Sequence, residues 1–342
     1  MEMVPGVRLG RVNVIPLTEF IVHPLSGDSF SFILAQVHHL GYNISRKKSK
    51  IKGIFIMLRI LLITLLSLFT TACAFAAPPA ANSPAISKID LTAKFDGFNG
   101  TAVFYTPDTE TYYVHNKKLS EKRSSPCSTF KIFAMYVGLV TGNIDYDNSL
   151  RKWNGTHYWY DAWNQDVDLA FAYKNSCVWY FRRAVNDIGY ESMQSYIDQL
   201  DYGNKDISDW AGVQNTNETL LDLKGFWIES SIKISPVEQT QVLHRIFTSL
   251  AQNHNDKLAT QMKQIMLTTE NADKNLKIYG KTGFGRVNGE NTDAWFVGMY
   301  EANNQTVYYA VRLDDPLNPN STSAKAKEIA INIINDNYKN FI

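Results

Sequence analysis

The stretch PCSTFKI, Pro126 to Ile132, places a serine and a lysine three residues apart at the start of an apolar segment. Its leading proline is typical of a first helical turn, so the pattern predicts a helix that opens near Ser125–Ser128 and closes at Gly142. On that helix Ser128 and Lys131 lie on one face, a turn apart. Because a buried ammonium is costly, this lysine must either reach water or lose its charge.

The runs on both sides of this helix predict the fold class. Gly100–Asn116 has two β-rich runs joined by a turn and predicts a hairpin, and Ser235–Leu250 begins with a capping pattern and continues with helical spacing. Three further strands are expected at Leu276–Gly283, Asp293–Glu301 and Thr306–Leu313, with a turn at Asn303-Asn304 between the last two. A last helix is expected at Ala324–Asn335. The sequence therefore predicts an α+β fold, in which helices flank a central antiparallel β-sheet and an all-helical lobe is inserted at about residues 143–250. We expect the active site between sheet and lobe.

Composition and charge limit the possible functions. The chain has 342 residues, a formal net charge of +1 and 45% apolar residues, which is typical of a globular protein with one large domain or two small ones. A near-neutral chain has no electrostatic reason to bind nucleic acid, so no such partner is expected. No metal site is expected either, because a His-Glu-x-x-His motif is missing and the only adjacent histidines, His38 and His39, lie near the N-terminus.

The N-terminal part has the pattern of an export signal. A basic cluster at residues 46–50 and Met57-Leu58-Arg59 precede the apolar run Ile60–Phe69, and Ala74-Phe75-Ala76 follows it. This pattern predicts a signal peptide over residues 57–76 that is cleaved near Ala76, and the apolar run is short for a membrane span. Residues 1–56 are interpreted as a leader or as an artefact of start-site choice, and residues 77–342 as a single domain. The mature chain is expected in the periplasm or secreted, without stable membrane association unless Cys73 carries a lipid.

Three short motifs follow one another along this domain. They are Ser128-x-x-Lys131, Ser176-Cys177-Val178 and Lys281-Thr282-Gly283. Each is weak evidence alone, but their order and spacing behind a signal peptide are specific. Together they indicate acyl transfer, in which a serine attacks a carbonyl after a nearby base removes its proton.

On these motifs, the sequence from about residue 90 onward resembles the class D (oxacillinase-type) β-lactamases, which belong to the penicillin-recognising serine acyltransferases. Further matching segments are Ala162–Phe181, Tyr202-Gly203-Asn204, Phe226–Gln239 and Tyr279–Gly285. The resemblance implies a hydrolase that opens β-lactam antibiotics, its small-molecule substrates. No feature of the sequence predicts an oligomeric state.

The resemblance also implies roles for single residues. Ser128 would be the nucleophile, and Lys131, N-carboxylated by CO2 or bicarbonate as the only added group, would be the base. Ser176 and Lys281 would pass a proton to the lactam nitrogen, while the backbone N–H groups of Ser128 and Phe284 would form the oxyanion hole. Residues expected around the carbamate form an apolar pocket: Phe130, Val178, Trp227 and Ile228. Within it, the Trp227 indole N–H would donate to the carbamate.

Substrate binding departs from the family pattern. Thr282 and Gly283, with a cation, would hold the substrate carboxylate, but the arginine usual near the start of the last helix is missing. Lys325 and Lys327 stand there instead, and Arg286 is another candidate. A lysine attracts a carboxylate but lacks the bidentate fork of arginine.

Two alternatives to a hydrolase stay open at the level of sequence. The domain could be a β-lactam sensor that stays acylated, or a cell-wall transpeptidase or carboxypeptidase. The apolar Val178 in the second motif, where transpeptidases usually have asparagine, favours a carboxylated lysine and hydrolysis. Cys127 and Cys177 flank candidate catalytic residues and could pair in an oxidising compartment or remain free thiols.

Overall fold

The computed structural model describes residues 84–342, which form one compact unit. The predicted leader, the signal peptide and Cys73 lie outside the described residues. Within 84–342, no helix combines the length and the apolar character needed to span a membrane.

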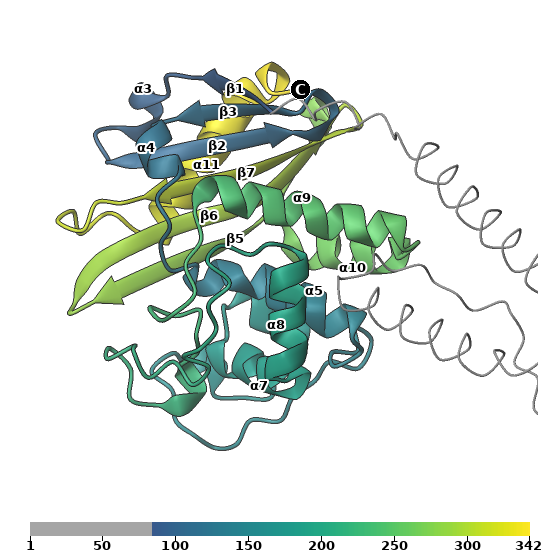
Figure 1. Cartoon of the computed structure of the whole chain (residues 1–342), viewed down its shortest axis with the longest axis vertical. Coiled ribbons are helices and arrows are strands. Elements are labelled where there is room, and N and C mark those ends of the chain that lie inside the picture. Colours follow the sequence, from purple (N-terminus) through teal and green to yellow (C-terminus); the bar gives the residue numbers. More distant parts are fainter. Residues whose placement is uncertain (1–83) are drawn as a thin grey trace, which may run out of the picture. The chain divides into compact units, whose positions relative to one another are not determined.

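A seven-stranded sheet forms the centre of the fold, in the order β1-β3-β2-β7-β6-β5-β4 (Figure 1). Only β1 and β3 run parallel; every other neighbouring pair is antiparallel. The strands are β1 (Ala85–Lys88), β2 (Gly100–Thr106), β3 (Thr111–His115), β4 (Leu267–Asn271), β5 (Leu276–Val287), β6 (Glu290–Ala302) and β7 (Gln305–Leu313). The predicted hairpin and the three C-terminal strands are therefore confirmed, with β1 and β4 added at the two edges.

Both faces of the sheet are buried, and alternate side chains of β2 enter two different cores. Phe104 packs in the core on the side of α11 (Ser323–Asn337), whereas Val103 packs in the larger core on the other side. Helix α9 (Pro236–Gln252) covers that second face, where it lies against β7 and β2 (Figure 1). The sheet is thus sandwiched between helices, because a strand buried on both faces needs a helical layer on each side.

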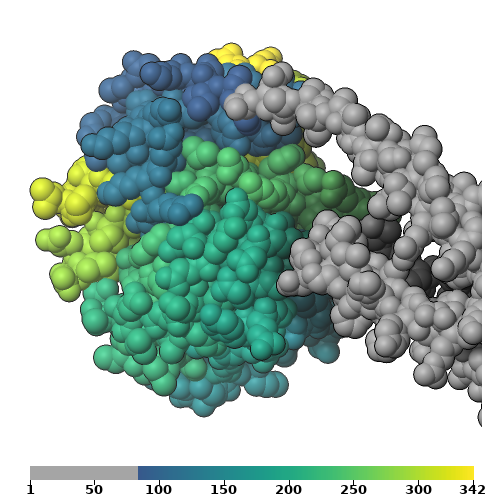
Figure 2. Space-filling view, in the orientation of Figure 1, coloured from purple at the N-terminus to yellow at the C-terminus, as the bar shows by residue number. Residues whose placement is uncertain are grey.

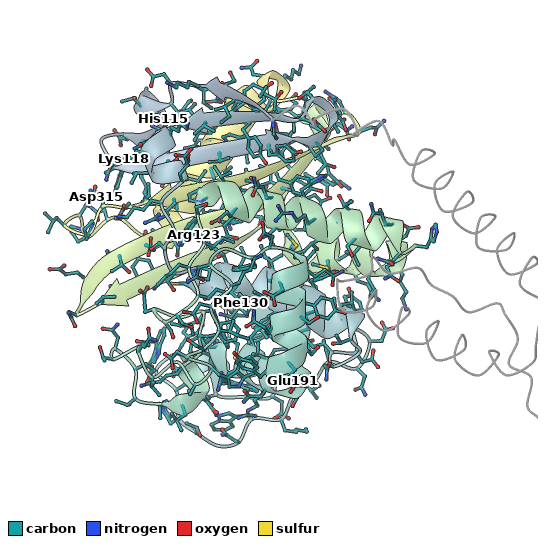
Figure 3. The ribbon with its side chains drawn as sticks, viewed as in Figure 1. His115, Lys118, Arg123, Phe130, Glu191 and Asp315 are labelled. Atoms are coloured by element: carbon teal, nitrogen blue, oxygen red, sulfur yellow. The ribbon has the colours of Figure 1, made fainter. Side chains whose placement is uncertain are left out.

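The helical lobe surrounds α5 (Phe130–Val140), which is buried on every side and packs against α7 (Val178–Ile188). Figure 3 places Phe130, the first residue of α5, between the sheet layer and the lobe. The other helices are α3 (Thr92–Phe95), α4 (Lys117–Ser120), α6 (Leu169–Lys174), α8 (Tyr190–Gln199) and α10 (Asp256–Met266). The 3-10 turns are η1 (Pro107–Thr109), η2 (Cys127–Thr129), η3 (Asp161–Trp163), η4 (Leu221–Leu223), η5 (Ala272–Lys274) and η6 (Tyr338–Asn340).

The range predicted for the lobe needs one adjustment. Helix α9 begins within residues 143–250 but packs on the sheet, so within that range the lobe helices that follow α5 end with α8. In the space-filling view the lobe and the layer of α9 adjoin, and side chains fill the space between their ribbons on this face (Figure 2). The long segment from Leu200 to Ser235 connects them with one 3-10 turn and no α-helix.

Candidate active site

The first motif lies where η2 passes into α5. The Lys131 side chain is fully buried, while Ser128 is half-buried, and Lys131 Nζ donates a hydrogen bond to Ser128 Oγ at 2.8 Å. The turn before them is closed by the Thr129 N–H, which donates to the Pro126 carbonyl. The predicted adjacency of serine and lysine on one helical face is confirmed.

Burial changes the acid–base chemistry of Lys131. Desolvation lowers the pKa of its amine from 10.5 to about 8, and two nearby thiols, those of Cys177 and Cys127, oppose this only weakly. The Phe181 ring lies 5.7 Å from Nζ. Since no carboxylate of the described residues pairs with this amine, burial shifts its protonation equilibrium toward the neutral form.

The predicted apolar pocket holds one polar group without a partner. Phe130 and Trp227 are fully buried and stack with ring centroids 5.3 Å apart, and Val178 and Ile228 are half-buried against the same core. Among the described residues, Trp227 Nε1–H is buried without a hydrogen-bond acceptor. A buried donor left unpaired is costly, so this indole is suited to a bound anion.

The third motif lies on β5, directly beside η2, the turn that carries Ser128. Strand β4 pairs only with Leu276–Tyr279, so the rest of β5 has β6 on one side and no strand on the other. Turn η2 contacts β5 there. A Cβ on Gly283 would lie 2.9 Å from the Pro126 carbonyl oxygen, so a side chain at this position would push strand and turn apart.

Lys281 of this motif is buried and held by β5 and α6. Its Nζ donates to the Thr282 carbonyl at 3.1 Å and lies 5.7 Å from the centroid of the Tyr173 ring, whose hydroxyl donates to the Gly280 carbonyl. Desolvation, followed by the charges of Lys131 and Lys327, holds the pKa of Lys281 well below its usual value. The structure therefore gathers Lys131 and Lys281 into one electrostatic environment.

The second motif occupies the junction between α6 and α7. Ser176 is half-buried and has φ of +54°, a left-handed conformation that is uncommon outside glycine, and its N–H donates to the Tyr173 carbonyl. Cys177 and Cys127 are buried free thiols, so the disulfide alternative is not realised. Burial raises the pKa of Cys177 to about 11 and that of Cys127 well above its usual value.

The candidate cations differ in their engagement. Lys325 bonds to Glu328 at 2.8 Å, and Arg286 donates to Asn291 and lies over the Phe284 ring. Lys327 is half-buried, and among the described contacts it has a ring neighbour but no ion pair. The positive charge of Lys327 also helps to lower the pKa of Lys281. Lys327 is therefore the candidate whose charge acts on the third motif.

Three residues of the site were not identified from sequence: Tyr173, Phe181 and Glu229. Tyr173 contacts Lys281 and Phe181 contacts Lys131, whereas Glu229 contacts Cys127, the residue before the first motif. No local pattern marks such long-range contacts, although all three fall inside or beside segments that resemble the family. Within residues 84–342, no group of three or more His, Cys, Asp or Glu is arranged to hold a metal ion.

Comparison with known proteins agrees with this geometry. Residues 99–335 match the family model described as the penicillin binding protein transpeptidase domain. The chain belongs to this family. The transpeptidase-family domain is 33% identical to the β-lactamase OXA-1 of Escherichia coli over 250 residues, which are 70% of this chain and 86% of that protein.

The domain is also similar to a regulatory protein and to a penicillin-receptor domain. It is 36% identical over 228 residues to the regulatory protein BlaR1 of Staphylococcus aureus, 66% of this chain but only 36% of that protein, so the chain spans little more than a third of that relative. The solved C-terminal domain of the Bacillus licheniformis BlaR penicillin-receptor matches with a TM-score of 0.63 and 28% identity, covering 76% of this chain and 98% of that one. Solved class D β-lactamases from Bacillus subtilis and Nostoc match with TM-scores of 0.59 and 0.61. The predicted fold class and family resemblance are confirmed.

Proposed function

We propose that this chain hydrolyses β-lactam antibiotics through a serine acyl-enzyme. The observation that carries the proposal is the 2.8 Å contact between Ser128 Oγ and the fully buried Lys131 Nζ. A pKa of about 8 leaves about one amine in ten neutral at pH 7, against about one in three thousand for an amine with a pKa near 10.5. Of the two protonation states of the amine, only the neutral one can accept a proton or add CO2.

The remaining motif residues supply the other requirements of acyl transfer. As Ser128 Oγ attacks the lactam carbonyl, the backbone N–H groups of Ser128 and Phe284 would bind the developing oxyanion, each donor worth roughly 3 kcal/mol. Ser176 and Lys281 would deliver a proton to the lactam nitrogen, which leaves as an amine. Thr282 and Lys327 would hold the substrate carboxylate.

The surroundings of Lys131 also fit carboxylation by CO2. An amine with a lowered pKa can add CO2, and the partnerless Trp227 indole N–H offers a donor for the resulting anion. The carbamate would supply an anionic oxygen that accepts the Ser128 proton and later activates the deacylating water.

Turnover of nitrocefin with and without bicarbonate tests this proposal. After CO2 is stripped at pH 6 to 7, the rate should fall about tenfold or more and return with added bicarbonate, because the amine must be neutral to add CO2. With ¹³C-bicarbonate, a carbamate signal should appear in the NMR spectrum and be missing in Lys131→Ala. Turnover that ignores bicarbonate, together with no carbamate signal, would count against a carboxylated base.

A second candidate function is β-lactam sensing without efficient turnover. The similarity to BlaR1 and to the BlaR penicillin-receptor domain supports it. The apolar Val178 favours hydrolysis, because it gives the Lys131 ammonium no polar partner. Intact mass after addition of benzylpenicillin separates the two: the adduct on Ser128 should disappear within minutes in a hydrolase and persist for hours in a sensor.

We also propose export of the mature chain, supported by the pattern over residues 57–76. Expression of the full chain in a bacterial host, followed by mass spectrometry of the periplasmic and secreted fractions, should give an N-terminus at Ala77. A lipid-modified N-terminus at Cys73 would instead indicate membrane association.

A further inference from the structure

Glu229 lies two residues after Trp227 and reaches two other elements. Its Oε1 accepts hydrogen bonds from the Cys127 thiol at 3.3 Å and from the Thr292 hydroxyl of β6 at 3.1 Å. Both Glu229 and Cys127 have positive φ, +48° in each case. Such conformations in non-glycine residues are held only when their surroundings determine them, and they cluster at functional sites.

The same carboxyl lies against the backbone of β5. A Cβ built on Gly285 would fall 1.7 Å from Glu229 Oε1, so this carboxyl occupies the space beside the residue that follows Phe284. One oxygen therefore contacts the turn that precedes Ser128, the strand that carries Phe284, and the neighbouring strand β6.

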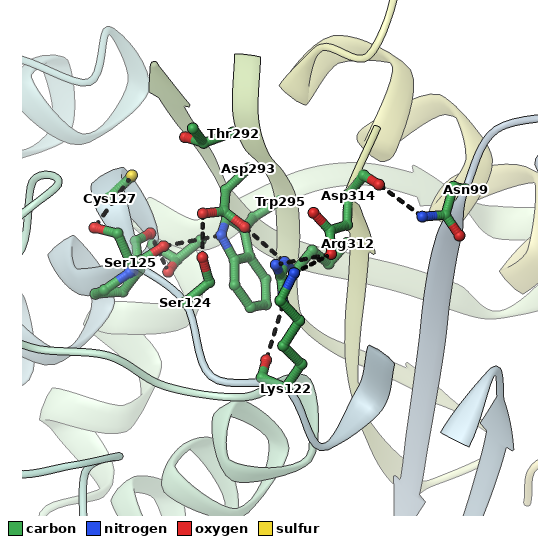
Figure 4. A network of polar contacts seen from close by, with 12 residues as sticks. Asn99, Lys122, Ser124, Ser125, Cys127, Thr292, Asp293, Trp295, Arg312 and Asp314 are labelled. Atoms are coloured by element: carbon green, nitrogen blue, oxygen red, sulfur yellow. Dashed lines mark hydrogen bonds and ion pairs between the residues drawn. The ribbon is translucent and has the colours of Figure 1, made fainter. Parts of the chain in front are cut away.

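A second set of bonds fixes the turn that carries Glu229. The Glu229 N–H donates to Ser125 Oγ at 2.9 Å, and that hydroxyl donates to the Trp227 carbonyl at 3.1 Å. The Trp295 indole of β6 donates to the Ser125 carbonyl at 3.0 Å, and Figure 4 shows Ser125 and Cys127 close to this part of β6. These contacts tie residues 125–127 and 227–229 to the sheet together.

We propose that Glu229 is a positioning residue for the oxyanion hole. Its Oε1 fixes the turn at Cys127 against β5, so that the N–H groups of Ser128 and Phe284 point at the same substrate oxygen. The requirement is for an acceptor oxygen of this reach, rather than for a negative charge, because both of its partners are neutral donors. This inference rests on the proposed function, since it concerns the acylation of Ser128.

The test measures the acylation rate of Ser128 by a fluorescent penicillin, with binding and rate separated by varying its concentration. Glu229→Ala should slow maximal acylation about 10- to 100-fold with little change in the half-saturating concentration, as expected when an oxyanion donor is misplaced. Glu229→Gln keeps the acceptor oxygen and should stay within about threefold of wild type. Thr292→Val and Cys127→Ala, which each remove one donor, should give smaller losses that are not additive with Glu229→Ala.

Glu301→Ala is the matched control, because Glu301 also accepts two hydrogen bonds, from Tyr279 and Lys263. Glu301 pairs with Lys277, at the other end of β5 from Phe284. It should lower the melting temperature without changing acylation per folded molecule. The positioning role is overturned if Glu229→Ala acylates like wild type, if Glu229→Gln is as slow as Glu229→Ala, or if the double variants are additive. Wild type that forms no penicillin adduct would instead overturn the proposed function, and with it this inference.

Discussion

At the scale of single residues, Lys131 combines a chemical advantage with a structural cost. Holding the pKa of a fully buried amine at about 8 rather than 10.5 costs about 3 kcal/mol of folding free energy. The folded pKa lies below the unfolded one, so the unfolded chain binds more protons between pH 8 and 10.5, and stability rises across that range. The cost is therefore fully present at pH 7.

We predict that Lys131→Met stabilises the protein while abolishing acylation. Methionine fills a similar volume without a charge, so the free energy of unfolding at pH 7 should rise by about 1 to 3 kcal/mol, and the gain should shrink above pH 8. Urea denaturation at pH 7 and pH 10 measures both effects. A variant less stable than wild type at pH 7 would show that the amine is not desolvated as described.

The Trp227 indole gives a second prediction at this scale. Trp227→Phe removes the partnerless N–H but keeps an aromatic ring beside Phe130, so the carbamate signal of Lys131 should weaken and deacylation should slow about tenfold or more. Trp179→Phe is the matched control, because Trp179 is equally buried but its N–H is bonded to the Trp163 carbonyl. Equal effects of both substitutions on the carbamate would point to packing instead of hydrogen bonding.

At the scale of elements, local sequence patterns predicted the caps and turns that local hydrogen bonds and backbone preferences determine. The capping pattern at the start of α9 predicts a capping box, and the structure confirms it. Ser235 and Glu238 each accept a hydrogen bond from the other's backbone N–H. The turn at Asn303 and Asn304 is confirmed as well, with both residues at the positive φ that asparagine tolerates. Strand β4 was missed, because its sequence LTTEN has little apolar character and it is held at the sheet edge by β5.

The candidate site was predictable only where a motif carried it. The spacing of Ser128 and Lys131 fixed their contact, since residues three apart on a helix face each other. The contact of Glu229 with Cys127 joins residues about a hundred positions apart, and that of Phe181 with Lys131 joins two helices. Such contacts follow from how whole elements pack, which no local spacing encodes.

Gly283 gives a prediction for the contact between β5 and η2. Gly283→Ala places a methyl group 2.9 Å from a backbone oxygen that cannot move alone, so strand and turn should separate and acylation should fall at least about tenfold. Gly100→Ala, whose methyl would lie 2.4 Å from the Phe95 ring and 2.8 Å from the Arg312 carbonyl oxygen, is a control in β2 with contacts at least as close. Acylation rates corrected for the folded fraction should fall only in Gly283→Ala.

At the scale of the whole molecule, a buried ion pair joins distant segments (Figure 4). Arg312 of β7 donates to Asp293 of β6 at 2.6 Å, and both are almost fully buried. Arg312 also donates to the Lys122 carbonyl, and Ser124 donates to Asp293. The segment from Lys122 to Ser124, which leads into η2, is therefore bonded to the two central strands β6 and β7. This arrangement couples the position of η2 to the integrity of the sheet.

We predict that Asp293→Ala lowers the free energy of unfolding by about 3 to 5 kcal/mol, because it leaves the Arg312 guanidinium buried without its main partner. Equilibrium urea denaturation measures the loss. Asp147→Ala, which breaks the exposed pair with Lys257, should leave the midpoint unchanged within error. An equally small effect at Asp293 would mean that water or Asp314 replaces the lost carboxylate.

The one-sided pairing of β5 beyond Tyr279 has a consequence for solubility. A strand with an unpaired side offers backbone donors and acceptors on which another chain could build a further strand, the usual route to self-association. Turn η2 packs on this part of β5 and also contacts β6, so loosening the turn would expose more of the strand that has this open side. Substitutions that loosen the turn should therefore promote aggregation as well as inactivity, and light scattering during mild heating would reveal the two effects together.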